Sequence, residues 1–375
     1  MAEEPEEPKP LRILEIGGYE FFATAVPEQT TFYRAAPKPR RQAGRAFGPL
    51  RLVRALLDLR SGKYDLLVIH TSQYAIWHPR TVLTTLRDWN VLSPLGLFAL
   101  VAWRLIAHFH RVPIAAVDLS DSFGVGRHNF FLLDRCAAFF KRELPSDAWQ
   151  MFYKTGHRDF PGASWRRRPR GLGWLAKTHP ISFGCAVEPP EDLVAEKTVD
   201  IFFSGALGHS TARTSGEAEL RALAREGYRI DIMSERLPRE VFWRRMAGAW
   251  LAWSPAGLGW DCERHYEAAL VGATPLINYP TILRHAPLKD GEHCILYAPE
   301  PGGLAEAARA ALADKPRLAR IAQAASAHVR QHHSWRARAE YVAVTVLGRR
   351  LDGARAEPVR ADGAAAPLPR RRATT

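Results

Sequence analysis

The residues best suited to chemistry lie close together, in residues 254–277. Gly257 and Gly259 follow an apolar run and precede an amphipathic segment, which predicts a strand, a glycine-bearing turn and a helix. Glycine lets the backbone approach a ligand, and a helix N-terminus offers unpaired N–H groups and a positive dipole end that favour phosphate. Arg264 and Glu267 are three residues apart and share one face of this helix. A guanidinium beside phosphates and a carboxylate accepting from ribose hydroxyls would together bind a nucleoside diphosphate.

Each of these elements has an ordinary structural explanation when it is taken singly. Glycine-bearing turns are common in α/β proteins, and an Arg/Glu pair three residues apart is usually a solvated ion pair contributing about 0.2–0.5 kcal/mol. The whole pattern, P-x-G-x-G-W-D-x-x-R-x-Y-E-A-x-x-x-G-x-x-P-L, is much more specific. The order of its parts therefore carries the functional prediction.

This pattern resembles the C-terminal donor-binding domain of GT-B-fold glycosyltransferases, in particular the CgeB-like and exostosin-like bacterial group. The resemblance implies that Glu267 binds the ribose of a sugar nucleotide and that the glycine turn lies at its phosphates. It extends more loosely over residues 199–340, and segments 118–121 and 140–144 are also similar to parts of the group. The donor-binding residues that it implies are Gly205, His209, Arg213, Gly257, Gly259, Trp260, Asp261, Arg264, His265 and Glu267.

We expect the Trp260 ring, inside the glycine turn, to stack on the donor or the acceptor. The sequence departs from many retaining GT-B enzymes, which carry a second glutamate seven residues before the ribose-binding one, where this chain has Trp260. The stereochemical outcome therefore stays open. The resemblance also implies no active-site metal and no cofactor besides the nucleoside diphosphate sugar. His108, His110, His332 and His333 are not accompanied by acid or cysteine clusters, so no metal site is predicted.

An inverting transfer needs a general base on the acceptor side. Asp121 is our first candidate, because Asp118 lies three residues earlier and a like charge raises a carboxyl pKa. Asp118 itself, His70 and Glu20 are the rivals, at or near other strand ends. The alternative explanation for Asp121 is equally strong, since an Asp after a strand often caps the next turn.

Two series of strands and helices must position these residues. Strands are expected at 11–16, 65–70 and 112–120, with helices at 50–59 and about 95–110 between them. A second series has strands at 199–205, 228–234, 249–255 and 274–278, with a helix opened by a capping box at 214–217. Alternation of this kind predicts parallel sheets covered by helices.

The predicted fold is α/β: two facing Rossmann-like domains in a GT-B arrangement, with the C-terminal helices packing back toward the N-terminal domain. We expect a disordered tail over 1–10, an acceptor-binding domain over 11–185, and a linker over 186–197. The nucleotide-sugar domain spans 198–333, a closing helix 334–350, and a second disordered tail 351–375.

The net charge of +13 suits phosphate-bearing ligands, nucleic acid or an anionic membrane. The cationic run at 165–170 is either a solvated loop or a border of the acceptor or membrane surface, and nucleic acid is the less favoured partner. Four separated cysteines, no secretory signal and no 20-residue apolar stretch indicate a cytoplasmic protein, with peripheral contact at the inner membrane face left open.

Sugar transfer to an unidentified acceptor is favoured over a sugar-nucleotide 2-epimerase or a non-catalytic basic binding module.

Overall fold

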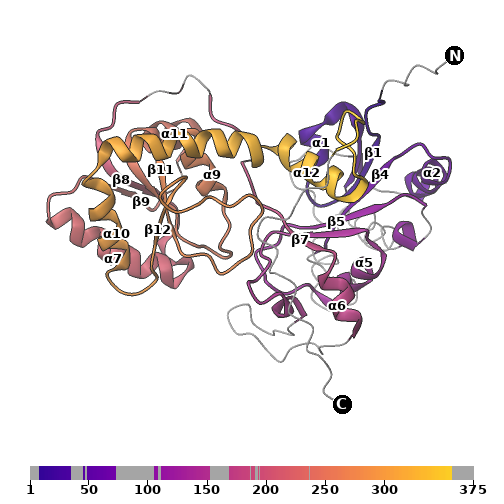
Figure 1. Cartoon of the computed structure of the whole chain (residues 1–375), viewed down its shortest axis with the longest axis horizontal. Coiled ribbons are helices and arrows are strands. Elements are labelled where there is room, and N and C mark those ends of the chain that lie inside the picture. Colours follow the sequence, from indigo (N-terminus) through magenta and orange to yellow (C-terminus); the bar gives the residue numbers. More distant parts are fainter. Residues whose placement is uncertain are drawn as a thin grey trace.

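The computed structural model describes residues 8–34, 45–46, 49–72, 105–108, 111–152, 169–185, 187–190, 193, 195–235 and 237–356. These residues form two parallel sheets, each covered by helices (Figure 1). Most of the helix expected at about 95–110 and most of the cationic run at 165–170 lie outside the described residues. No helix among the described residues is long and apolar enough to cross a membrane.

The first sheet contains seven parallel strands in the order β3-β2-β1-β4-β5-β6-β7. Their bounds are β1 Ile13–Gly17, β2 Thr30–Arg34, β3 Arg45–Ala46, β4 Leu66–His70, β5 Ile114–Asp118, β6 Ala138–Lys141 and β7 Thr178–Pro180. The four central strands are apolar runs that are buried along their whole length, as expected for a sheet covered on both faces. The strand order reverses between β1 and β4, and ligands of open α/β sheets bind outside such a point.

Helices cover both faces of this sheet. One face packs against α2 (Pro49–Arg60), α5 (Phe130–Arg135) and α6 (Pro169–Leu175), and the other against α1 (Phe22–Ala25) and α12 (Trp335–Leu347). Short 3-10 turns occupy η1 (Pro27–Gln29), η2 (Arg127–Asn129) and η3 (Ala148–Phe152). The described residues therefore form a Rossmann-like domain that includes one helix from the far end of the chain.

The second sheet contains five parallel strands in the order β12-β11-β10-β8-β9. Their bounds are β8 Val199–Ser204, β9 Ile230–Met233, β10 Ala249–Trp253, β11 Thr274–Asn278 and β12 Ile295–Tyr297. One hydrophobic cluster of this domain contains side chains of the turn η4 (Leu207–His209), α7 (Thr211–Arg225) and α10 (Gly303–Leu312). Two further clusters contain side chains of α8 (Arg239–Ala247) and α9 (Glu263–Leu270). The order reverses between β8 and β10, which is the second candidate ligand position.

The chain returns to the first domain at its end. Helix α11 (Lys315–His332) packs on the second sheet, Ser334 caps the following helix by accepting from Ala337 N–H, and α12 then packs against α1 (Figure 1). Ala339, Val342 and Ala343 of α12 are buried in the core of the first domain. This return confirms the predicted GT-B architecture of two Rossmann-like units.

Three local expectations need correction. Helix α7 begins at Thr211 because Ser210 accepts from Arg213 N–H, so the capping box expected at 214–217 lies inside the helix. The packed chain continues past 350, since Leu351 is buried and its carbonyl accepts from Leu11 N–H at 3.0 Å. Ile181 packs in the first domain and Cys185 in the second, so the crossing between domains begins before 186.

Candidate functional site

Two turns meet where the order of the second sheet reverses, and each carries an arginine. Arg213 lies in the first turn of α7, after β8, and its Nη1 donates to the Ala206 carbonyl at 3.0 Å. Arg264 lies in the first turn of α9, after β10, and its Nη2 donates to the Ser204 carbonyl at 2.7 Å. Both guanidiniums lie over the Phe203 ring, at 6.0 Å and 4.9 Å from its centre. Two cations therefore share one small region.

Hydrogen-bond partners are missing for some of the guanidinium N–H groups of these two arginines. Nε of Arg213, and Nε and Nη1 of Arg264, are buried and have no hydrogen-bond partner in the described part of the chain. Burial lowers the pKa of Arg213, and the neighbouring Arg264 charge lowers it further. Buried charges normally require an opposite charge and complete hydrogen bonding. The pair is therefore suited to a doubly charged anion such as a diphosphate.

The predicted glycines lie against these arginines. A Cβ at Gly257 would lie 2.6 Å from Nη2 of Arg213, and one at Gly205 would lie 2.9 Å from Nη2 of Arg264. A side chain at Gly257 would therefore displace the guanidinium. The structure brings Gly205, Arg213, Gly257 and Arg264 together, while the side chain of His209 lies outside the described residues.

The N-terminus of α9 faces this region without a side-chain cap. Cys262 is the N-cap residue, in extended conformation, and its side chain accepts no hydrogen bond from the first turn. Helices α7, α11 and α12 are capped by Ser210, Asp314 and Ser334. The uncapped first turn of α9 leaves N–H groups and a positive dipole end for an anion.

Glu267 lies one turn further along α9. Its Oε1 accepts from Trp243 Nε1 at 3.1 Å, and burial, with the nearby Glu263 charge, raises its pKa to about 7. A half-buried carboxylate held by one indole N–H retains acceptor capacity for hydroxyl groups. This placement is compatible with the predicted role at a ribose.

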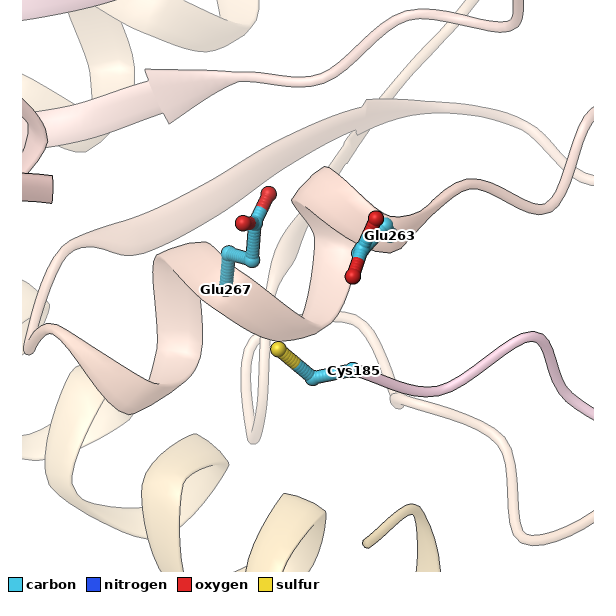
Figure 2. Close-up of side chains that lie close together, drawn as sticks. All are labelled: Cys185, Glu263 and Glu267. Atoms are coloured by element: carbon cyan, nitrogen blue, oxygen red, sulfur yellow. The ribbon is translucent and has the colours of Figure 1, made fainter. Parts of the chain in front are cut away.

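One group in the described part of the chain has the spacing of a metal site. The potential ligand atoms of Cys185, Glu263 and Glu267 lie within 4.8 Å of one another. Figure 2 shows both glutamates on α9 and Cys185 on the segment that crosses between the domains. The Cys185 thiol donates to the Val187 carbonyl at 3.0 Å, and burial raises its pKa. Because the thiolate is the form that binds metals, this neutral thiol is a weak ligand.

Trp260 and Asp261, which were also predicted to bind the donor, instead make hydrogen bonds inside the protein that hold the turn in place. Trp260 is only 5% exposed, and its Nε1 donates to the carbonyls of Asn278 and Tyr279 at 2.9 and 3.1 Å. Asp261 accepts from Phe183 N–H, and from Tyr266 Oη–H at 2.6 Å. The stacking role expected for Trp260 is therefore corrected, because its ring is part of the core.

His265 is also an internal support. Its Nε2 lies 2.9 Å from the Trp260 carbonyl, which only accepts, so Nε2 carries the proton. Nδ1 lies 2.7 Å from Ser254 Oγ and 3.7 Å from Cys262 Sγ. The ring is almost completely buried and fixes the shape of the turn.

The first domain holds the same turn from the other side. Glu143 follows β6 and accepts from the N–H groups of Trp260 and Asp261, both at 2.9 Å. Arg142 ion-pairs with Asp121 and lies 3.4 Å from Glu143. Sequence reasoning did not assign these two residues a role, although the similarity of segment 140–144 to the glycosyltransferase group was a signal.

The three carboxylates considered as general base, Asp118, Asp121 and Glu20, all lie near a cation. Asp118 is buried and paired with Lys141 Nζ at 3.0 Å; burial alone raises its pKa, but Lys141 and Ser120 outweigh burial and lower it. Asp121, 46% exposed, contacts Arg142. We expected repulsion between the charges of Asp118 and Asp121. Lys141 beside Asp118 and Arg142 beside Asp121 oppose that repulsion. Glu20 lies 3.7 Å from Arg34.

His70 occupies a different position. It ends β4 where the order of the first sheet reverses, and its Nε2 lies 2.7 Å from Oε1 of Glu15 on β1. Glu15 also accepts three N–H groups at the start of α1, from Phe21, Phe22 and Ala23. An acceptor-only carboxylate places the proton on Nε2 of the ring, and Nδ1 has no hydrogen-bond partner among the residues that the structure describes. His70 is therefore a buried imidazole that Glu15 orients, and its Nδ1 can still accept a hydrogen bond.

Part of the chain is similar to a known family, and its fold is similar to those of several solved structures. Residues 220–343 match a family model described as glycosyl transferase-like. No curated protein matches the sequence. Among solved structures, the chain is similar to HepE from Anabaena in complex with UDP-glucose, with 14% identity, 89% of this chain and 99% of that chain covered, and a TM-score of 0.48.

Two further similar structures are synthases. A sucrose-phosphate synthase from Thermosynechococcus elongatus is 11% identical, with coverage of 88% and 96% and a TM-score of 0.47. An α,α-trehalose-phosphate synthase (UDP-forming) from Burkholderia xenovorans, in complex with glucose-6-phosphate, is 9% identical, with coverage of 88% and 98% and a TM-score of 0.49. Residues 220–343, which match the glycosyl transferase-like model, contain α9 and four of the five strands of the second sheet.

Proposed function

We propose that the protein transfers a sugar from a nucleoside diphosphate donor to an acceptor bound mainly by the first domain. The observation that carries the proposal is the pair of buried Arg213 and half-buried Arg264, whose guanidinium N–H groups are only partly satisfied by the described residues. The diphosphate would lie between these guanidiniums and the uncapped N-terminus of α9. The family match over residues 220–343 supports transfer as the reaction.

The same residues would act on the leaving group. Negative charge grows on the diphosphate as the bond to the sugar breaks, and fixed cations stabilise that charge more strongly in the transition state than in the ground state. Glu267 would accept hydrogen bonds from the ribose hydroxyls and set the depth of the nucleoside. We propose that the reaction needs no divalent ion, because two cations and a helix dipole already face the diphosphate.

A thermal-shift screen against nucleoside diphosphate sugars tests the donor site. A donor present at 100 times its Kd should stabilise the fold by about 2.7 kcal/mol, and the stabilising donor is then assayed for transfer with and without EDTA. The Glu267→Gln variant should keep its stability and bind the donor about tenfold more weakly, through loss of a charge-assisted hydrogen bond.

The matched control is Arg221→Ala on α7, an exposed arginine paired with Glu217 at 2.6 Å. It should bind the donor as the parent does. Absence of stabilisation by every nucleoside diphosphate sugar would refute the donor site. If the protein releases the 2-epimer of the donor's sugar in the absence of an acceptor, the reaction is epimerisation and not transfer. If EDTA abolishes the activity, the proposal that no divalent ion is needed is refuted.

A further inference from the structure

Helix α2 carries apolar side chains on two opposite faces. One set packs into the core of the first domain: Leu52, Ala55 and Leu59. The other set is 87%, 55% and 62% exposed: Leu50, Val53 and Leu57. Residues three, four and seven apart share one face of a helix, so the exposed set forms a continuous stripe. This stripe lies on the side of α2 away from the core.

The concentration of exposed apolar groups on α2 is unusual within the described residues. Among all the described residues, nine large hydrophobic side chains are exposed. Three of the nine belong to this one stripe, and the other six are distributed over several segments. Single exposed apolar residues need no explanation, whereas a contiguous set indicates an interaction site. The stripe is therefore a candidate contact surface.

Cationic side chains border the stripe on both sides. Arg54 is exposed and lies four residues after Leu50 and three before Leu57. Arg60 is exposed and lies three residues after Leu57, on the opposite edge of the stripe. The one acidic residue of α2, Asp58, is paired with Lys63 at 2.9 Å. The border of the stripe is thus positive.

We propose that α2 binds the surface of an anionic membrane, with its apolar stripe among the lipid chains and Arg54 and Arg60 at the headgroup phosphates. An apolar face bordered by arginines is the pattern of helices that lie in the plane of a membrane interface. Arginine stems can lie along the apolar layer while the guanidinium stays at the headgroups. The net charge of +13 favours the same surface over long range.

A second copy of the chain fits this surface poorly. A twofold contact places the same patch on both subunits, so the arginines that border each stripe would approach those of the other copy. An anionic lipid surface supplies the opposite charge instead. The proposal does not depend on the donor site, because α2 belongs to the first domain and the arginine pair to the second.

Cosedimentation with vesicles tests the proposal. The full chain should bind vesicles of phosphatidylglycerol and phosphatidylcholine and should bind phosphatidylcholine alone much more weakly. The triple variant Leu50→Ser, Val53→Ser, Leu57→Ser should bind the anionic vesicles at least about tenfold more weakly, because it removes apolar area from the interface. Arg54→Gln and Arg60→Gln should each weaken binding by about fivefold, and less at high salt.

The controls are Val241→Ser on α8 and Leu172→Ser on α6, which remove exposed apolar side chains outside the stripe and should leave vesicle binding unchanged. Thermal unfolding of all variants shows whether they fold, as expected for surface changes. Equal binding by the triple variant and the parent would overturn the proposal, as would a dimer in solution that the triple variant dissociates. Loss of binding in the arginine variants but not in the triple variant would assign the surface to a soluble polyanion.

Discussion

Glu143 of the first domain accepts a hydrogen bond from the backbone N–H of Asp261, in the second domain, at 2.9 Å. Its other carboxylate oxygen accepts from Trp260 N–H, and a Cβ at Gly259 would lie 2.5 Å from the carboxylate. Two consecutive N–H groups of the turn before α9 are thus held by a side chain of the opposite domain. This contact fixes the start of α9, and with it Arg264, relative to the first domain.

The Glu143→Gln variant tests this positioning. The amide can accept from only one of the two N–H groups with its oxygen, and leaving the other unsatisfied costs about 1–3 kcal/mol. We expect a small loss of thermal stability and a donor KM raised about tenfold, with a smaller change in kcat. Burial raises the pKa of Glu143 to about 7, so the donor KM of the parent should also rise below pH 7, more steeply than that of the variant, in which Glu267 still titrates near this pH.

The control is Glu219→Gln, which alters a carboxylate that accepts the Ala305 N–H at 2.9 Å, outside this contact. It should change stability but not the donor KM. A donor KM in Glu143→Gln equal to that of the parent, at every pH, would show that the contact between the domains does not position the donor turn.

Removal of Arg213 or Arg264 should lower turnover more than donor affinity. Each faces a diphosphate whose charge increases in the transition state, and loss of one such donor typically costs about 10²–10³ in kcat. Arg264→Lys should recover part of the activity, since the ammonium keeps the charge but loses the second N–H group. Steady-state kinetics with the stabilising donor give both constants, and turnover within threefold of the parent in both variants would remove them from the reaction.

His70, instead of Asp121, is now the stronger candidate for the general base. Its ring is oriented by Glu15, and its buried Nδ1 has no partner among the described residues, whereas Asp121 is paired with Arg142. His70→Gln should lower kcat by about 10²–10⁴ at unchanged donor affinity, and Asp121→Asn should stay within about tenfold of the parent. The reverse result would restore Asp121 and show that its ion pair opens during turnover.

The sequence predicted the two sheets and the turn at 257–259, because these follow from apolar runs, glycine positions and local helix signals. The return of the last helix was implied by the resemblance to GT-B glycosyltransferases. The sequence did not predict which side chains of the turn are available to a ligand and which are buried and hold the turn in shape. Trp260, Asp261 and His265 share the turn with Gly257, yet their side chains point into the core. Their neighbours are Glu143, Phe183 and Asn278, which are distant in sequence, so no local pattern contains this information.

The same limit applies to the pairings in the first domain. The prediction that Asp118 raises the pKa of Asp121 used only their separation along the chain. The structure adds Lys141 and Arg142 from the next strand and its turn, and these cations oppose the effect. Strand alternation placed His70 at a sheet edge, but Glu15 becomes its partner only because β1 and β4 are neighbours.

Cys262 should be the most reactive of the four cysteines. Burial raises the pKa of Cys136 to about 11 and that of Cys294 to about 12, and it also raises that of Cys185. For Cys262, burial is outweighed by His265 and Arg264, which lower its pKa to about 6. Iodoacetamide at pH 7, followed by peptide mass spectrometry, should label Cys262 first, and the rate should fall about tenfold per unit below pH 6.

Because Cys262 is the N-cap residue of α9, a bound nucleoside diphosphate should slow this labelling. Protection by the nucleotide but not by the free sugar places the diphosphate at the turn. Uniform labelling of all four cysteines would instead show that the turn opens together with the core. The Cys262→Ser variant identifies any signal from the other three thiols.

A group of histidines at the end of α11 should make the protein less stable in acid. His333 donates from Nε2 to the Ala286 carbonyl and accepts from Ser182 Oγ–H at Nδ1, both at 2.8 Å, so the buried ring is neutral. Burial, with the charges of neighbouring histidines, lowers its pKa well below the usual value and lowers that of His285 to about 4. The unfolded chain binds these protons near pH 6.5, whereas the folded chain does not. Stability from these groups is therefore complete above pH 6.5 and falls as the pH decreases from 6.5 toward 4.

Urea unfolding at a series of pH values measures this effect directly. Each such histidine contributes about 1.4 kcal/mol for each unit by which its pKa is lowered. His285 stacks on Tyr341 with ring centres 3.7 Å apart, and His285→Phe preserves an aromatic ring there without a titrating group. The variant should unfold with a shallower dependence on pH between 6.5 and 4 than the parent. An identical pH dependence in the two proteins would show that His285 is protonated in the folded state and that its burial does not oppose the charge.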